Sequence, residues 1–428
     1  KGIRMARGIM PDYLKSEFGK IINRKYFAKE ANPIRTKAFD NLIKQGLPNR
    51  KDENWRFTDI SPIKRGNFRI SEQKDAPNTD YNISEHKLDS LKTVVFFNGH
   101  FQKDLSTLPK RLRVISNQEY MEQNGWALSQ PTISSFDLLN TAFMDSGVSI
   151  IVDRDRQINE PVRLLFICSG DEKLMTYPRI HVDVGESGFL SLFEQHVGDC
   201  SEYFFNQSVI VNIERNARLE HIRLQNNSES TINMGNLHVK QKEDSTYHFV
   251  QFAFGGKLGR TDVNIDLCEK GANCFVEGLC LSDHKQHLDV NVVTNHYAPN
   301  CISSQNFKSI LKDHSSGVFN GRVIVHAGAQ KTDSSQSNKN LLLSKDALMN
   351  SNPQLEIYAD DVKCSHGSST GALEPDALFY IRSRGIDQET ATALLVHGFA
   401  SEIIETLKNH DIKDLVITYF NSWLEQNN

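Results

Sequence analysis

The sequence predicts a mainly β protein in which a β-helix core is flanked by an N-terminal helical or mixed α/β domain and a C-terminal helical domain. Two hydrophobic patterns and an internal repeat predict this fold. Between about residues 147 and 372, apolar residues alternate at period two in short runs separated by turn residues. Before this region the signals are mixed and begin with helical apolar spacing, and after it the apolar spacing is helical. The predicted domains are therefore residues 1–146, 147–372 and 373–428.

The N-terminal domain contains both helical and strand signals. Apolar residues recur at helical spacing over residues 32–46, and Gly46 followed by Leu47 and Pro48 ends the predicted helix. A strand is expected over residues 93–99 and a further helix over residues 134–145. This mixture predicts an α/β segment with a helical start.

The β region contains an internal repeat. Similar strand–turn–strand segments begin near residues 181, 211, 238 and 263, and alignment of their turns matches the small residues Gly188, Ala217, Ser245 and Ala272. The steps between these residues are 29, 28 and 27. Turns at short intervals also occur in a β-sandwich, so turns alone leave both folds open. A nearly constant step favours the β-helix, in which each repeat forms one coil.

The C-terminal segment predicts three helices. Pro375 suits the first turn of a helix, Gly385 suits a left-handed C-terminal cap, and Asp387 can cap the next helix. The expected apolar stripe of the second helix is Ala391, Leu394, Leu395, Phe399, Ile403 and Leu407, and the third helix carries Leu415, Val416, Tyr419, Phe420, Trp423 and Leu424. These helices are expected to cover part of the β core.

Composition excludes several classes of protein. Hydrophobic residues make up 39% and charged residues 24% of the chain, as in ordinary globular proteins. A formal net charge of −4 gives no reason to expect nucleic acid or an anionic membrane as a partner. There is no apolar run of about 18 residues, and the first 15 residues lack the apolar stretch of a signal peptide. The seven cysteines are scattered and do not suggest a disulfide framework, so a reducing, cytoplasmic location is expected.

Cys364 and His366 are the candidate metal ligands. They stand two residues apart in a strand-like run and therefore share one face, about 6.5–7 Å apart along the backbone. A thiolate and an imidazole can bind the same soft metal, although they supply only half of a coordination sphere. The other ligands must come from elsewhere in the chain, from sulfide or from a partner. The alternative is that Cys364 is a small core residue, because a cysteine on a strand usually is.

Other cysteines and histidines have weaker patterns. Cys268, Cys274 and Cys280 are six residues apart, but a predicted turn at Lys270 and Gly271 interrupts their register, so core packing is expected. His284 and His287 lie in a predicted loop, where solvated side chains are expected and metal binding is the alternative. The chain contains no GxxxxGK[ST] phosphate loop, no G-x-S-x-G elbow and no zinc-protease helix. No enzymatic activity of its own is therefore expected.

Four segments near the C-terminus, together with one near the N-terminus, resemble a known family. They are Gln-Ser-Asn-Lys-Asn-Leu-Leu-Leu from residue 336, Pro-Gln-Leu-Glu-Ile from 353, Asp-Val-Lys-Cys-Ser-His-Gly from 361, Leu-Phe-Tyr-Ile-Arg-Ser-Arg-Gly from 378, and Glu-Asn-Trp-Arg-Phe-Thr from 53. They resemble the SufB/SufD family of iron–sulfur cluster assembly proteins. Lys-Cys-Ser-His-Gly resembles the SufD type, whereas SufB-type chains have a Glu-His-Glu stretch here. A SufB-like role therefore fits poorly.

The resemblance implies a right-handed parallel β-helix and a scaffold role without ATPase activity. It implies pairing with a SufB-like paralogue through the last β-helix strands, with a homodimer as the alternative in its absence. Cys364 and His366 would then bind iron or an Fe–S cluster transiently at this interface, and no tightly bound cofactor is expected. A SufC-like ABC ATPase would dock on the C-terminal domain through Leu378, Phe379, Tyr380, Arg382, Arg384 and Gly385.

A different class of function also fits a β-helix. Carbohydrate-active lyases and hydrolases use this fold, and a clustered acid pair on one solenoid face would mark such an enzyme. These enzymes are usually secreted, and no export signal is expected here.

Overall fold

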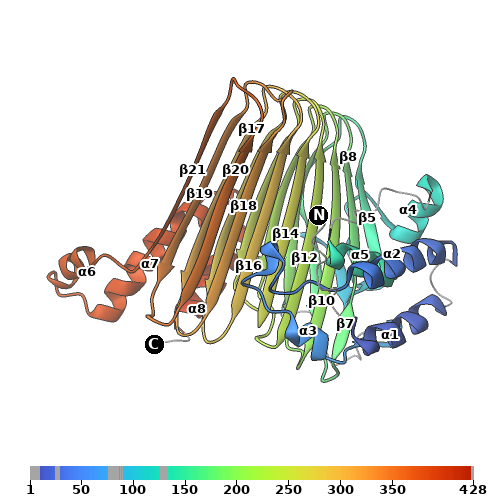
Figure 1. Cartoon of the computed structure of the whole chain (residues 1–428), viewed down its shortest axis with the longest axis horizontal. Helices are drawn as coiled ribbons and strands as arrows, with labels where there is room; N and C mark the ends of the chain where they lie inside the picture. The colour runs from blue at the N-terminus through green and yellow to red at the C-terminus, as the bar shows by residue number, and fades with distance from the viewer. Residues whose placement is uncertain are drawn as a thin grey trace, which may run out of the picture.

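The computed structural model describes residues 10–24, 29–75, 86, 88, 90–125 and 134–425. Its core is a parallel β-solenoid formed by two long sheets (Figure 1). From residue 179 to residue 371, successive strands along the chain alternate between the sheets, so each of these coils contributes one strand to each sheet. The predicted fold class, a mainly β protein with a β-helix core and helices at both ends of the chain, is confirmed.

In the described part of the chain, nine strands follow one another across the first sheet, and β4 at its end is antiparallel to β5. They are β4 (Arg113–Ser116), β5 (Gly147–Val152), β8 (Arg179–Val184), β10 (Tyr203–Ile213), β12 (Thr231–Gln241), β14 (Leu258–Leu267), β16 (His287–His296), β18 (Ser316–Val325) and β20 (Leu348–Ile357). The short strands β1 (Arg69–Ile70) and β7 (Leu174–Thr176) pair with each other, and β7 also pairs with β10.

The described residues contribute ten strands to the second sheet, of which β2 and β3 form an antiparallel pair at one end. In spatial order they are β3 (His100–Gln102), β2 (Lys92–Phe97), β6 (Gln157–Cys168), β9 (Phe189–Gly198), β11 (Arg218–Gln225), β13 (Thr246–Ala253), β15 (Asn273–Ser282), β17 (Ile302–Leu311), β19 (Asp333–Leu342) and β21 (Lys363–Gly371).

The predicted repeat coincides with the coils of the solenoid. The residues that follow the four aligned turn positions are Phe189, Arg218, Thr246 and Asn273, and they pair directly with one another in neighbouring strands. Each aligned position is preceded by a residue with positive φ: Ser187, Asn216, Asp244 and Gly271. In these four coils, a residue with positive φ followed by a small residue therefore turns the chain into the corresponding strand.

Helices cover the outer faces of both sheets. The N-terminal helices α1 (Asp12–Ile22), α2 (Asn32–Gln45) and α5 (Ser135–Phe143) pack around Phe204 of the first sheet and around Tyr177, which follows β7. The C-terminal helices α7 (Gln388–Ile404) and α8 (His410–Glu425) pack around Phe252 and Leu279 of the second sheet. The other helices are α3 (Ser61–Arg65), α4 (Asn117–Asn124) and α6 (Pro375–Arg382), with short 3-10 turns at Lys29–Ala31, Glu53–Trp55, Gln73–Asp75 and Lys103–Leu105.

The expected N-terminal elements are present. The predicted helix over 32–46 is α2, and Gly46 follows it with a φ of 77°. The predicted strand over 93–99 is β2, which pairs with β6 and so extends the solenoid sheet. The helix expected over 134–145 is α5, and Ser134 forms its capping box with Asp137. The domain boundaries stay a prediction.

The three C-terminal helices are also present, but the apolar stripe predicted for α7 is partly wrong. Leu394 is 50% exposed, whereas Val396 and Ala400 are buried. Leu394, Leu395 and Val396 are consecutive apolar residues, so spacing alone could not show which of them faces the sheet. Contact with β15 and α8 determines the buried face. Among the described residues, no helix has the length and apolar character needed to cross a bilayer.

Candidate functional site

The solenoid ends in two edge strands. Within the described residues, β20 pairs only with β18, and β21 pairs only with β19 (Figure 1). The outer edge of each strand thus carries backbone groups without a strand partner. Such an edge is a template for pairing with another chain. Pro353 lies in β20, a position compatible with an edge strand because proline has no N–H to donate.

Cys364 and His366 both lie on β21, as expected from the sequence. Cys364 is in register with Ser334 and His366 with Gln336, and these two residues of β19 are buried. The register therefore directs both candidate ligands toward the inner face of the last coil. Cys364 is half-buried against a small apolar cluster that includes Val325 and Ala359. His366 is exposed at the open end.

The surroundings of Cys364 favour the protonated thiol. Partial burial raises the pKa of Cys364, and the carboxylate of Asp333 raises it further. Lys363 is exposed and is in register with Asp333, on the other parity of the strand. A soft metal that binds Cys364 must therefore displace a proton, and its affinity will depend on pH.

A ladder of buried polar side chains leads to this pair. His296 Nε2 and Ser303 Oγ are 2.8 Å apart, and Ser303 Oγ lies 2.8 Å from Ser334 Oγ, one register position below Cys364. This ladder was not foreseen from the sequence. The sequence feature that corresponds to it is the presence of Ser, Gln and Asn, in place of apolar residues, at inward positions of β17 and β19.

A second row of buried side chains, the amides of Gln336 and Gln305, lies in the strands next to His366. Gln336 Nε2 donates to Gln305 Oε1 at 3.0 Å, so the nitrogen of the Gln336 amide points away from β21. Gln336 Oε1 is buried and has no hydrogen-bond partner within the part of the chain described. A buried acceptor of this kind is costly unless a donor reaches it, and His366 is its register neighbour.

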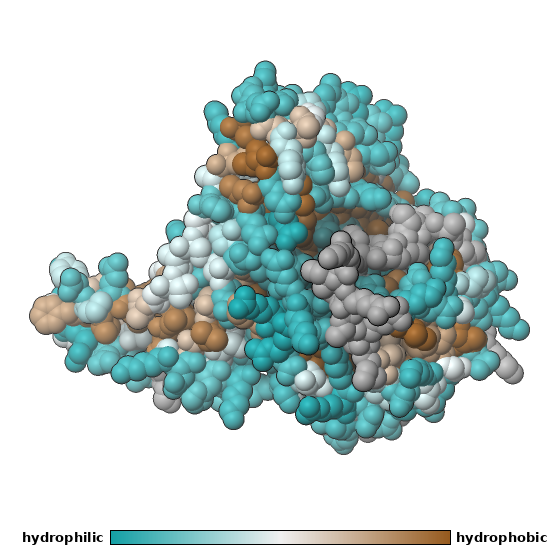
Figure 2. Space-filling view, in the orientation of Figure 1, coloured by the Kyte–Doolittle hydropathy of each residue, from teal (hydrophilic) through white to brown (hydrophobic). Residues whose placement is uncertain are grey.

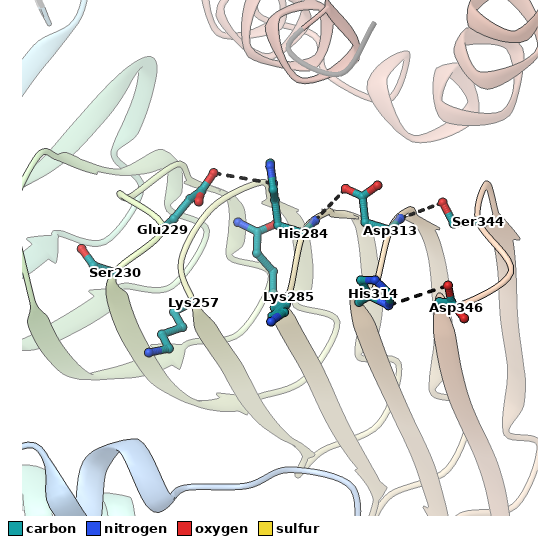
Figure 3. A pocket seen from close by; sticks show the side chains of 10 residues that line it. Glu229, Ser230, Lys257, His284, Lys285, Asp313, His314, Ser344 and Asp346 are labelled. Carbon is teal, nitrogen blue, oxygen red and sulfur yellow. Dashed lines mark hydrogen bonds and ion pairs between the residues drawn. The ribbon is translucent and has the colours of Figure 1, made fainter.

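Within the described residues, Cys364 and His366 belong to no group of three possible metal ligands. Among the described residues, one group of three possible metal ligands has its ligand atoms within 4.8 Å of one another, and that group is Glu229, Asp283 and His284. It lies in the turns that precede β12 and β16, beside a groove of about 820 Å³ (Figure 3). A hydrogen bond to Asp283 raises the pKa of His284, so this cluster is satisfied as an ion pair.

The other candidate histidines and cysteines do not gather into one site. His287 does not join His284, because its Nδ1 lies 2.7 Å from Ser316 Oγ and its Nε2 lies 2.9 Å from Thr58 Oγ1. The expectation of a solvated loop residue is wrong for His287, which begins β16. Cys274 and Cys280 are buried as predicted, whereas Cys268 is exposed because it follows the end of β14.

The residues predicted to bind the ATPase lie on and just after α6. This helix contains no buried residue and projects from the end of the solenoid (Figure 1). Phe379 is 74% and Tyr380 58% exposed, so α6 presents apolar surface to solvent (Figure 2). The Arg384 guanidinium lies over the Tyr380 ring at 4.5 Å. Of the other predicted residues, Leu378 is half-buried, Arg382 and Gly385 are exposed, and Gly385 has a φ of 88°.

Comparison with known proteins agrees with this architecture. Residues 166–399 match the family described as "SUF system FeS cluster assembly, SufBD core domain". Residues 14–164 match "SufBD protein N-terminal region". Together these two matches span the N-terminal helices, the solenoid and most of α7.

Named relatives cover nearly the whole chain. The iron–sulfur cluster assembly protein SufD of Escherichia coli is 29% identical over 90% of this chain and 91% of its own length. Protein ABCI7, chloroplastic, of Arabidopsis thaliana is 32% identical over 89% of this chain and 83% of its own length. A SufBD family protein of Synechocystis is 30% identical over 86% of each chain. The chain therefore belongs to the SufBD family of iron–sulfur cluster assembly proteins and is a homologue of SufD.

Proposed function

We propose that this chain is a non-ATPase scaffold subunit of an iron–sulfur cluster assembly complex. In this proposal it pairs with a SufB-like paralogue, docks a SufC-like ABC ATPase, and assists iron acquisition and nascent cluster formation where the paralogues meet. One observation carries the proposal: Cys364 and His366 lie two residues apart on β21, whose outer edge has no strand partner among the described residues. Iron or the cluster is the cargo of this site, not a resident cofactor.

The edge strands supply a reason for a partner. A second solenoid that paired with β20 and β21 would bury the open end and bring its own side chains next to Cys364 and His366. Association would therefore complete both the hydrogen bonding of the edges and the coordination sphere. In the absence of the paralogue, a second copy of this chain could pair in the same way.

The buried polar side chains of β19, next to Cys364 and His366, favour transient binding of iron. The unpartnered Gln336 Oε1 can accept the N–H of one His366 nitrogen, which leaves the other nitrogen free to bind metal. Partial burial raises the pKa of Cys364, so its thiolate forms when a metal displaces the proton. Two ligands from each of two chains hold a cluster less permanently than four cysteines of one chain.

The C-terminal helices provide a route from the ATPase to this site. Glu402 of α7 lies 2.6 Å from Lys308 Nζ of β17 and 3.8 Å from Lys339 Nζ of β19, the strand next to β21. Lys308 Nζ also donates to the carbonyl of Phe399 at 2.8 Å. ATP-driven dimerisation of the ATPase would pull on α6 and α7, and these contacts would transmit the displacement to the last coils. The interface would then open to iron.

The family assignment supports the assembly role over a carbohydrate-active enzyme. The proposed role requires no catalysis by the chain itself, and the hydrolysis of ATP would belong to the ATPase. The cytoplasmic location predicted from the cysteine pattern stays part of this proposal.

Anaerobic affinity purification from the source cells, followed by mass spectrometry, tests the proposed assembly. Recovery of an ABC-type ATPase and a longer paralogue in fixed ratio with the chain is the expected result. Recovery of the chain alone, under conditions that keep other complexes intact, would contradict the proposal.

A further inference from the structure

Two buried cysteines from neighbouring coils are in contact near the N-terminal end of the solenoid. Cys168 is the last residue of β6, and Cys200 lies in the turn between β9 and β10. Their Sγ atoms are 2.7 Å apart, and the side chains are 3% and 2% exposed. All seven cysteines lie in the described part of the chain, and no other pair among them is in such contact.

The backbone holds this contact in place. The Asp199 N–H donates to the Cys168 carbonyl at 3.1 Å. Gly198, which has a φ of 141°, lies so close to Cys168 that a Cβ at this position would fall 2.6 Å from its Sγ and 1.9 Å from its carbonyl oxygen. Only glycine therefore lets β9 end against Cys168.

The turn that carries Cys200 is also fixed from the next coil. The hydroxyls of Ser228 and Ser230 donate to the Cys200 carbonyl at 3.0 and 2.9 Å. Three successive coils thus position the two sulfur atoms. Backbone contacts therefore fix the positions of both thiols, which side-chain packing in a core alone would not do.

We propose that Cys168 and Cys200 form a reversible disulfide by exchange with a small disulfide such as glutathione disulfide. The Cys200 thiolate attacks one sulfur of glutathione disulfide and releases one glutathione. Cys168 then loses its proton, attacks the mixed disulfide at Cys200 and releases the second glutathione. The protein loses two electrons and two protons, and glutathione disulfide is reduced to two glutathiones.

Two features of the site suit this sequence of steps. A hydrogen bond from Cys168 lowers the pKa of Cys200, whereas burial raises the pKa of Cys168, so Cys200 is the first nucleophile. Asp199 and Ser201 on either side of Cys200 are exposed, so opening of one surface turn brings the thiol to the solvent. The resulting bond would join β6 covalently to the turn of the next coil.

Thiol counting and peptide mapping test the proposal. The native chain is incubated with a series of glutathione disulfide to glutathione ratios, then denatured and alkylated. The expected result is that two of the seven thiols become protected. Trypsin should release residues 164–173 linked to residues 180–215, two hydrogens lighter than the sum of the reduced peptides.

Variants make the test specific. Cys200→Ser and Cys168→Ser should each abolish the linked peptide, whereas Cys268→Ser, at an exposed cysteine, should leave it unchanged. Oxidised wild-type protein should also unfold at a higher temperature than the reduced protein, because the bond restricts the unfolded chain. Seven free thiols at every ratio, or glutathionylation without the linked peptide, would overturn the proposal. Its outcome is independent of the proposed assembly function.

Discussion

His366 of β21 lies in direct register with Gln336 of β19, whose side-chain nitrogen donates to Gln305 and whose oxygen is buried without a partner in the described structure. This relationship links the exposed edge of the solenoid to its interior. The amide chain fixes which end of Gln336 faces β21. It thereby provides an acceptor that can hold the imidazole of His366 in one orientation.

Replacement of Gln336 by Leu should weaken iron binding by the assembled complex by about 10-fold or more, because the acceptor that orients His366 is lost. The affinity is measured by anaerobic titration with ferrous iron. Asn338→Leu is the matched control, since Asn338 is another buried amide on the same strand but is in register with Ser368. An equal loss of affinity in both variants would show that Gln336 acts only through the packing of the coil.

Replacement of Phe379 by Ala should weaken binding of the ABC-type ATPase by about 10-fold or more, because an exposed aromatic side chain on a projecting helix is a typical interface anchor. Surface plasmon resonance with the purified ATPase measures this effect. Phe275→Ala removes another exposed phenylalanine, on β15 of the solenoid, and should leave the affinity unchanged. Wild-type affinity in Phe379→Ala would place the docking surface elsewhere.

Acid should destabilise the chain partly through His296. Burial lowers the pKa of His296 to about 4, below its ordinary value, so the unfolded chain binds a proton between about pH 6.5 and pH 4 that the folded chain does not. The free energy of unfolding should therefore fall as the pH falls through this window, by about 2 kcal/mol between pH 7 and pH 5 for this residue alone.

Urea unfolding of wild-type protein and His296→Gln at pH 7 and pH 5 measures this contribution. The variant should lose less stability on acidification than wild type, by the same amount of about 2 kcal/mol. Identical pH dependence in the two proteins would mean that His296 does not titrate differently in the folded and unfolded states.

Replacement of Arg260 by Ala should destabilise the chain by about 3–5 kcal/mol, because it leaves buried carboxylates without their counter-charge. Arg260 pairs with Asp262 and Asp289, donates to the carbonyl of Asn54 and lies 3.8 Å from the centre of the Trp55 ring. It therefore joins the N-terminal segment to the first sheet. Arg218→Ala, at an exposed arginine, should change the free energy of unfolding by no more than about 0.5 kcal/mol in a urea titration.

The coils of the solenoid could be predicted because their signal is local. A residue with positive φ followed by a small residue precedes each of β9, β11, β13 and β15, and the small residues can be aligned in the sequence. Cys364 and His366 could be placed on one face for the same reason, since strand parity is local. The exposed face of α7 could not be assigned, because Leu394 is one of three consecutive apolar residues and tertiary contacts select among them.

Contacts between coils could not be predicted. Gln336 meets Gln305, and Cys168 meets Cys200, only because the strands stack at a register that the residue types alone do not specify. The cluster of Glu229, Asp283 and His284 likewise brings together two turns that are far apart in the chain. Sequence spacing suggested His287 as the companion of His284, and the fold instead supplies Glu229.

The central claim is that Cys364 and His366 become a complete iron site only when a partner covers the open end of the solenoid. Anaerobic titration of ferrous iron into the chain alone, and into its complex with the paralogue, tests this claim most directly. The complex should bind iron much more tightly than the chain, and Cys364→Ala or His366→Ala should abolish the gain, whereas Ser365→Ala on the opposite parity of β21 should preserve it. Equal iron binding by the wild-type complex and both ligand variants would contradict the account.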